Sequence, residues 1–217
     1  DEAGNFTRER LERFISDSVA TEAEHGDQTD SFRKLLVDFY INRGEEKTPT
    51  FYLHRFIELI SDLQFIIPTM QEVQIKQLNN WPTWLYVIDH HGKAYDRKHS
   101  LHGAYHADEM RYFCDGGWTA TKEDDDDRTF GDAFTNILVR FVKNGDPSSS
   151  SLDFPPVTKE MPFRHVLLNS KPSVRKEAFR PDNAKFWLET VPSVVSGDRL
   201  RHSRLPAAEA HIIHTEL

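Results

Sequence analysis

Five histidines lie close together in one polar stretch, and they are the side chains of this chain best suited to proton transfer near neutral pH. His99, His102 and His106 are spaced three and four residues apart, which on a helix would turn their imidazoles toward one metal ion. Gly103 weakens a helix there, and neither a cysteine motif nor an HExxH pattern accompanies the histidines. We therefore predict no metal site and no cofactor. Taken singly, each of these histidines could instead be an ordinary residue of a solvated loop without a chemical role. The five are His90, His91, His99, His102 and His106.

A buried strand is expected directly before these histidines. Residues 84–88 form a continuous apolar run between Pro82 and Asp89, which is typical of a strand covered on both faces of a sheet. In open α/β sheets, ligands bind beyond the carboxyl ends of the strands, so the histidine-rich stretch is the expected place for a site. Residues 164–168 are predicted as a further strand.

Helices are expected around these strands, at residues 11–19, 32–40, 50–61, 68–78, 134–142 and 186–195, where apolar residues recur at helical spacing. Pro68 is expected in the first turn of its helix. The run from Glu123 to Asp127 is expected to be a solvated acidic loop, with a calcium site as the alternative. The last helix is expected to pack in a core, with a homodimer face as the alternative. Two central strands cannot form an independent sheet, so either the helices form a bundle of their own or the missing strands lie in another polypeptide. The strand-like runs favour the second alternative.

Composition excludes several classes of protein. The chain has 217 residues and a formal net charge of −8, which argues against nucleic acid as a partner. No apolar run approaches the roughly 20 residues of a membrane span, and the single cysteine, Cys114, excludes an internal disulfide. The tetrapeptide His214-Thr215-Glu216-Leu217 resembles the signal that retrieves soluble proteins to the endoplasmic reticulum, which predicts the lumen of that compartment. No secretion signal opens the sequence at Asp1, so we expect that a preceding portion exists.

The segment Gly103-Ala104-Tyr105-His106-Ala107-Asp108-Glu109-Met110 resembles the stretch around the catalytic histidine of type-B carboxylesterases and cholinesterases. The resemblance implies the C-terminal part of an α/β-hydrolase fold, in which residues 1–217 supply the last strands of a mostly parallel central sheet packed with helices. Cholinesterases carry a disulfide pair at the positions of Ile67 and Ala184, so the broader carboxylesterases are the closer resemblance. Other segments resemble the same family in the same order, namely residues 62–68, 84–90, 140–147, 154–158 and 184–187.

The same resemblance implies a shared catalytic triad. The opening Asp1-Glu2-Ala3-Gly4-Asn5-Phe6 resembles the segment that carries the acid of the triad, which implies Glu2 as the acid and His106 as the base. No Gly-x-Ser-x-Gly occurs, so the serine and the oxyanion hole are expected from the N-terminal portion of the same esterase. The implied reaction is hydrolysis of a small-molecule carboxylic ester through an acyl-serine. The alternatives are a catalytically inactive cholinesterase-like adhesion or binding protein and a metal-binding helical module built on the histidines.

Overall fold

The computed structural model describes residues 6–44, 47–91, 103–112 and 124–195, which fall into two compact units. The first unit holds the described residues up to Glu72 together with those from Arg180 onward, and the second holds those from Val73 to Phe179. No helix among these described residues is both long and apolar enough to cross a membrane.

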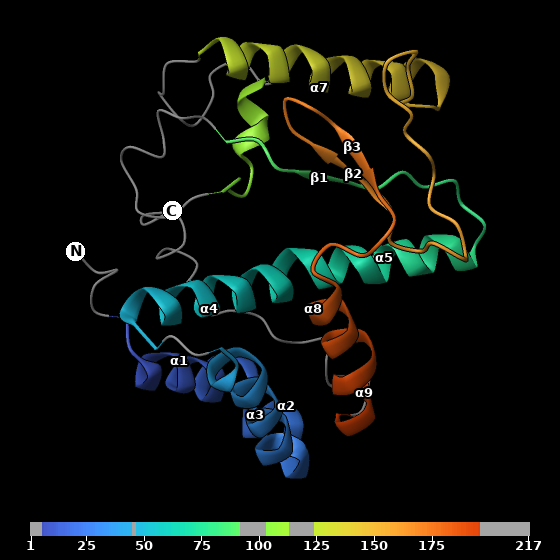
Figure 1. Cartoon of the computed structure of the whole chain (residues 1–217). Coiled ribbons are helices and arrows are strands. Elements are labelled where there is room, and N and C mark those ends of the chain that lie inside the picture. Colours follow the sequence, from blue (N-terminus) through green and yellow to red (C-terminus); the bar gives the residue numbers. More distant parts are fainter. Residues whose placement is uncertain (1–5, 45–46, 92–102, 113–123, 196–217) are drawn as a thin grey trace. The chain divides into compact units, whose positions relative to one another are not determined.

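The first unit is built from helices (Figure 1). Leu11, Leu36 and Leu59 come from three of these helices and are all fully buried, which shows that the amphipathic faces meet in one core. The predicted helices near residues 11–19, 32–40 and 50–61 are thereby confirmed. The elements are α1 (Arg8–Phe14), α2 (Glu22–His25), α3 (Thr29–Leu36), α4 (Pro49–Ser61), α8 (Pro181–Lys185) and α9 (Val191–Val194).

Threonine caps fix the starts of two helices in this unit. The Thr7 hydroxyl accepts a hydrogen bond from the backbone amide of Arg10 at 3.3 Å, before α1. The Thr48 hydroxyl accepts one from the amide of Phe51 at 3.1 Å, and Pro49 takes the first position of α4. Both arrangements satisfy an amide that has no partner within its own helix, and proline at the first position has no amide to leave unpaired.

Prolines inside long helices follow widened turns. Pro68 occupies the first turn of α5 (Ile67–Leu78) as predicted, but α5 is continuous with α4 through a π-helical segment, Asp62–Ile66. A helical proline cannot donate to the carbonyl four residues earlier, and its ring clashes with that carbonyl, so a wider π turn relieves the conflict. The π-helical segment Phe186–Thr190 precedes Pro192 in the same way.

The second unit contains a mixed sheet in the order β1-β2-β3. β1 (Tyr86–Ile88) pairs in parallel with β2 (His165–Leu168), with Tyr86 opposite Val166. Both strands were predicted and are confirmed. β3 (Ser173–Arg175) pairs antiparallel with β2 and was not predicted. β1 was expected to be buried on both faces, but among the described residues Tyr86 is 40% exposed, and β1 lies at an edge of the described sheet.

Helix α7 (Asp125–Asn144) lies along this sheet (Figure 1). Its buried face, with Phe130, Phe134 and Ile137, forms one core cluster with Val166 and Leu168 of β2. The cap residue Asp124 accepts hydrogen bonds from the amides of Asp126 and Asp127, both at 2.9 Å. The acidic run is therefore a helix start from Asp124 onward, and the expectation of a solvated loop is wrong, because carboxylates are stabilised by the free amides at a helix N-terminus.

Candidate active site

His106 lies in a turn that leads into the short 3₁₀ helix η6 (Asp108–Tyr112). The amide of Asp108 donates to the carbonyl of Tyr105 at 3.2 Å, which closes the turn around His106. Ala107 adopts a left-handed φ of 65°, a conformation that costs a residue with a Cβ about 1–2 kcal/mol. The side chain of His106 is exposed, so its imidazole can be reached by a small molecule.

Among the residues predicted to form a site, His106 alone is placed. Glu2, His99 and His102 lie outside the described residues, as do His214, Thr215, Glu216 and Leu217. The predicted pairing of Glu2 with His106 and the alternative metal site of the histidines therefore stay predictions.

Next to η6, one carboxylate gathers donors from three elements. Asp127 Oδ1 accepts hydrogen bonds from His90 Nε2 at 3.0 Å, from Arg111 Nη2 at 2.9 Å and from the Tyr112 hydroxyl at 3.1 Å. The other oxygen, Oδ2, accepts from the backbone amide of Asp124 at 3.1 Å and so completes the capping box of α7. His90 follows the carboxyl end of β1, while Arg111 and Tyr112 end η6.

This cluster is almost closed to water. The side chains of Asp127, His90 and Arg111 are only 2%, 6% and 7% exposed. The imidazole of His90 stacks on the ring of Phe130 with 4.3 Å between the ring centroids. A Cβ at Gly131 would lie 2.7 Å from Cδ1 of Tyr112, so this ring packs directly on the backbone of α7.

The charges in the cluster support one another. Burial alone would raise the pKa of Asp127, but the hydrogen bond from His90, the bond from the amide of Asp124 and the charge of Arg111 outweigh it and lower that pKa. Because an ionised carboxylate only accepts hydrogen bonds, the Nε2 atom of His90 carries the proton. Burial raises the pKa of Asp108, although Arg111 opposes this shift. These contacts hold the side chains of the cluster in place, and none of the side chains described in it is an activated nucleophile.

Sequence reasoning missed this cluster because it treated the acidic run as a single solvated feature. One signal was present. Asp124 and Asp127 are three residues apart just before the apolar pattern of α7, which is the spacing of a capping box, although that motif usually ends in glutamate or glutamine. Nothing in the spacing pointed to His90, Arg111 or Tyr112, which reach Asp127 only through tertiary folding.

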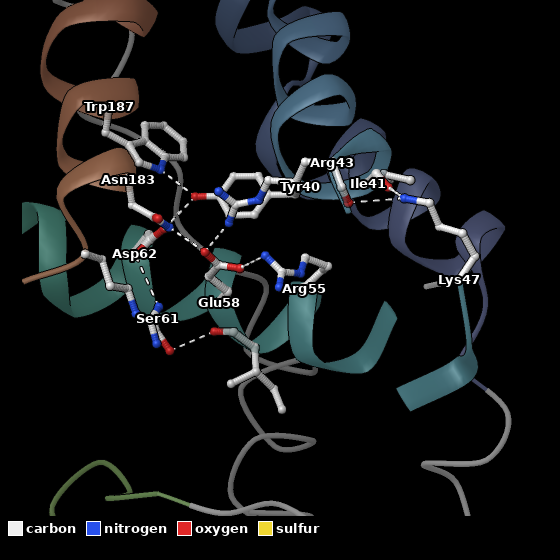
Figure 2. A network of polar contacts seen from close by, with 12 residues as sticks. Tyr40, Ile41, Arg43, Lys47, Arg55, Glu58, Ser61, Asp62, Asn183 and Trp187 are labelled. Atoms are coloured by element: carbon white, nitrogen blue, oxygen red, sulfur yellow. Dashed lines mark hydrogen bonds and ion pairs between the residues drawn. The ribbon is translucent and has the colours of Figure 1, made fainter. Parts of the chain in front are cut away.

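A second polar network lies in the first unit, around Asp62 (Figure 2). The Tyr40 hydroxyl and Asn183 Nδ2 donate to Asp62 Oδ2 at 2.6 and 2.5 Å. Trp187 Nε1 donates to the Tyr40 hydroxyl at 2.6 Å, and Arg180 forms an ion pair with Asp62 at 3.5 Å. Burial raises the pKa of Asp62, and these partners only partly offset that shift.

Beside this network, a depression of about 400 Å³ is open to solvent. Glu58 on its wall forms ion pairs with Arg43 and Arg55 and accepts a hydrogen bond from Asn183 at 2.8 Å. Among the described residues, no histidine, serine or cysteine lines this depression. We therefore interpret this network as a structural contact that holds α8 against α4, and we place the candidate active site at His106.

Comparison with known proteins points to one family. The family model described as the carboxylesterase family matches residues 2–187. Gut esterase 1 of Caenorhabditis elegans is 26% identical over 191 residues, which cover 82% of this chain and 34% of that protein. Pyrethroid hydrolase Ces2a of Mus musculus is 24% identical over 215 residues, covering 93% of this chain and 36% of that protein. Cocaine esterase of Homo sapiens is 24% identical over 170 residues, which cover 76% of this chain and 29% of that protein. The chain thus spans about a third of the length of these curated relatives.

Proposed function

The chain belongs to the carboxylesterase family, and we propose that it is the part of a serine carboxylic-ester hydrolase that supplies the histidine and the acid of a Ser-Glu-His triad. His106 is the base and Glu2 is the acid. The nucleophilic serine and the oxyanion hole come from an N-terminal portion of the same esterase, and the substrate is a small carboxylic ester. The observation that carries this proposal is an exposed His106 in a closed turn, within the segment that the family model matches.

The roles follow from the chemistry of an imidazole. His106 takes the proton from the serine hydroxyl as that oxygen attacks the ester carbonyl, and it then returns the proton to the leaving alcohol. Water enters in the second half of the reaction and is deprotonated by the same imidazole as its oxygen attacks the acyl carbonyl. The bond to the serine oxygen then breaks, the imidazolium returns its proton to that oxygen, and the carboxylic acid leaves. Glu2 accepts a hydrogen bond from the second ring nitrogen of His106, which fixes the tautomer and stabilises the imidazolium.

Labelling of the intact protein with a fluorophosphonate probe tests the proposal, because such probes react with the activated serine of a hydrolase. We expect one labelled serine outside residues 1–217. His106→Ala should lower the labelling rate by at least about 10³-fold, and Glu2→Gln should lower it as well. An unlabelled protein, or labelling of His106→Ala at the native rate, would contradict the proposal and favour an inactive cholinesterase-like binding protein.

We also propose the lumen of the endoplasmic reticulum as the site of action, on the basis of the tetrapeptide at residues 214–217. Deleting these four residues from the intact protein should move it from cell extracts to the medium without changing its ester hydrolysis. Because the retrieval receptor reads the terminal leucine, Leu217→Lys should have the same effect. Retention of both variants inside the cell would contradict this proposal.

A further inference from the structure

Asp127 has more hydrogen-bond partners than a helix cap requires. The capping box uses only its Oδ2 atom, which accepts from the amide of Asp124 at 3.1 Å. Three further donors converge on Oδ1, all within 3.1 Å, although the side chain is only 2% exposed. An ionised carboxylate with this many charge-assisted bonds in a nearly dry place is a rigid anchor point.

Two of those donors come from the segment that carries His106. Arg111 and Tyr112 end η6, which begins two residues after His106. Arg111 also forms an ion pair with Asp108 at the start of η6, with 3.6 Å between Nε and Oδ1. Both ends of η6 are therefore tied through Arg111 to the carboxylate of Asp127, while His90 ties the end of β1 to the same atom.

The turn at His106 needs such an anchor. Ala107, the residue directly after it, is held at a φ of 65°, where residues with a Cβ are disfavoured. Backbone hydrogen bonds across this turn run from the amide of Asp108 to the carbonyl of Tyr105 at 3.2 Å and from the amide of Met110 to the carbonyl of Ala107 at 3.1 Å. A strained backbone of this kind persists where the surrounding structure determines it.

We propose that Asp127 is the positioning residue for His106: through Arg111 and Tyr112 it fixes η6 against α7 and the end of β1, and so holds the strained turn that presents the imidazole. This inference rests on the proposed function, since it assigns to Asp127 the alignment of the base with the serine. Asp127 itself touches no reacting atom, and its effect is on the rate at which a correctly folded site reacts.

Fluorophosphonate labelling of the intact protein gives two separate readouts, the rate constant and the final labelled fraction. We expect Asp127→Asn to lower the rate constant about 10- to 100-fold with an unchanged labelled fraction, because a displacement on the order of 1 Å at a catalytic group costs about that much. The matched control is Asp125→Asn. That carboxylate belongs to the same acidic run, its side chain is 97% exposed, and it forms an ion pair with Arg128. The control should stay within about twofold of the native rate.

Two further variants test the inference, and the first of them, Tyr112→Phe, keeps it testable if Asp127→Asn folds poorly. Tyr112→Phe removes one donor and keeps the ring against Gly131, so it should lower the rate constant by about 2- to 10-fold. Adding Ala107→Gly to Asp127→Asn should raise the rate constant at least about threefold above that of Asp127→Asn alone, because glycine adopts a positive φ without support from the Asp127 contacts. A merely structural role of Asp127 would lower the labelled fraction instead and would gain nothing from Ala107→Gly.

The outcomes separate this inference from the proposed function. If the native protein is unlabelled, or if His106→Ala is labelled at the native rate, the proposed function fails. If the native protein is labelled and His106→Ala is not, but Asp127→Asn and Tyr112→Phe both keep the native rate constant, the positioning role alone is overturned.

Discussion

Asp62 is the buried carboxylate on which the first unit concentrates its hydrogen bonds. Its Oδ2 atom accepts from both Tyr40 and Asn183, and the side chain has no exposed surface. Asp62→Asn replaces one carboxylate oxygen by an amide group that donates, so Arg180 or one of the two buried donors loses its acceptor. We expect the free energy of unfolding to fall by about 1–3 kcal/mol, measured by urea denaturation.

Asp182→Asn is the matched control for this change, because Asp182 lies on α8 next to Asn183 and is exposed. It should change the stability by less than about 0.5 kcal/mol. Equal effects of the two substitutions would show that the Asp62 network contributes no more than a surface charge.

His165 should make the stability of the protein depend on pH. It is only 4% exposed, and burial lowers the pKa of its imidazole from 6.5, although a backbone hydrogen bond from the ring to Phe163 opposes this shift. Between the lowered pKa and 6.5 the unfolded chain therefore binds more protons than the folded one. The contribution of His165 is complete above pH 6.5 and is lost as the pH falls toward the lowered value.

Urea unfolding of the native protein and of His165→Gln at a series of pH values between about 8 and 5 measures this contribution. The stability difference between the two proteins should shrink as the pH falls. A difference that stays constant over the whole range would rule out titration of His165 as its source.

Helix α7 packs so closely against η6 that Gly131, within α7, is needed to leave room for the ring of Tyr112. Alanine at an exposed helix position is normally about 1 kcal/mol more favourable than glycine. At Gly131 the order should reverse, because the new Cβ would lie 2.7 Å from the Tyr112 ring. We expect Gly131→Ala to destabilise the protein by about 1–3 kcal/mol, as measured by thermal or urea unfolding. Asn136→Ala, at an exposed position of the same helix, should be neutral or stabilising, and a stabilising Gly131→Ala would contradict this packing.

The elements differ in how well their sequences predict them. α7 was predicted because its apolar face repeats over many turns, and the apolar run of β1 marked a strand without any partner in view. β3 was missed because Ser173–Arg175 is short and partly exposed, so its pairing with β2 leaves no periodic pattern. The continuity of α4 with α5 through the π-helical segment Asp62–Ile66 was also missed, because the proline at position 68 indicated the first turn of a separate helix.

The candidate site likewise has one part that the sequence predicted and another part that it did not. His106 was predicted as the base through the family resemblance of the segment that surrounds it, and it lies exposed in a turn; its role as the base stays a prediction. The support beneath it comes from His90, Arg111, Tyr112 and Asp127, which are up to 37 residues apart in the sequence. Each of these residue types is ordinary at its own position, so only the fold reveals that they share one oxygen atom.

Among the described residues, each of the two units has a hydrophobic core of its own. Ile41 is fully buried in the first, and Ile137 belongs to the cluster of α7 and β2 in the second. Ile41→Val and Ile137→Val should each lower the free energy of unfolding by about 0.5–1.5 kcal/mol, through the loss of one buried methylene. Because the two side chains pack among different neighbours, the double variant should lose the sum of the two effects to within about 0.5 kcal/mol.

Ile137→Val combined with Val166→Ala provides the contrasting pair, since both residues lie in the same cluster and can share one enlarged cavity. Their double variant should depart from the sum by about 0.5 kcal/mol or more. Urea denaturation of the intact protein, followed by fluorescence and by circular dichroism, measures all six proteins, the native one included. Non-additivity between Ile41 and Ile137 as large as that within the cluster would mean that the two cores share their packing energy. Additivity between Ile41→Val and Ile137→Val would mean that core residues of the first unit can be substituted without weakening the packing that supports His106 in the second unit.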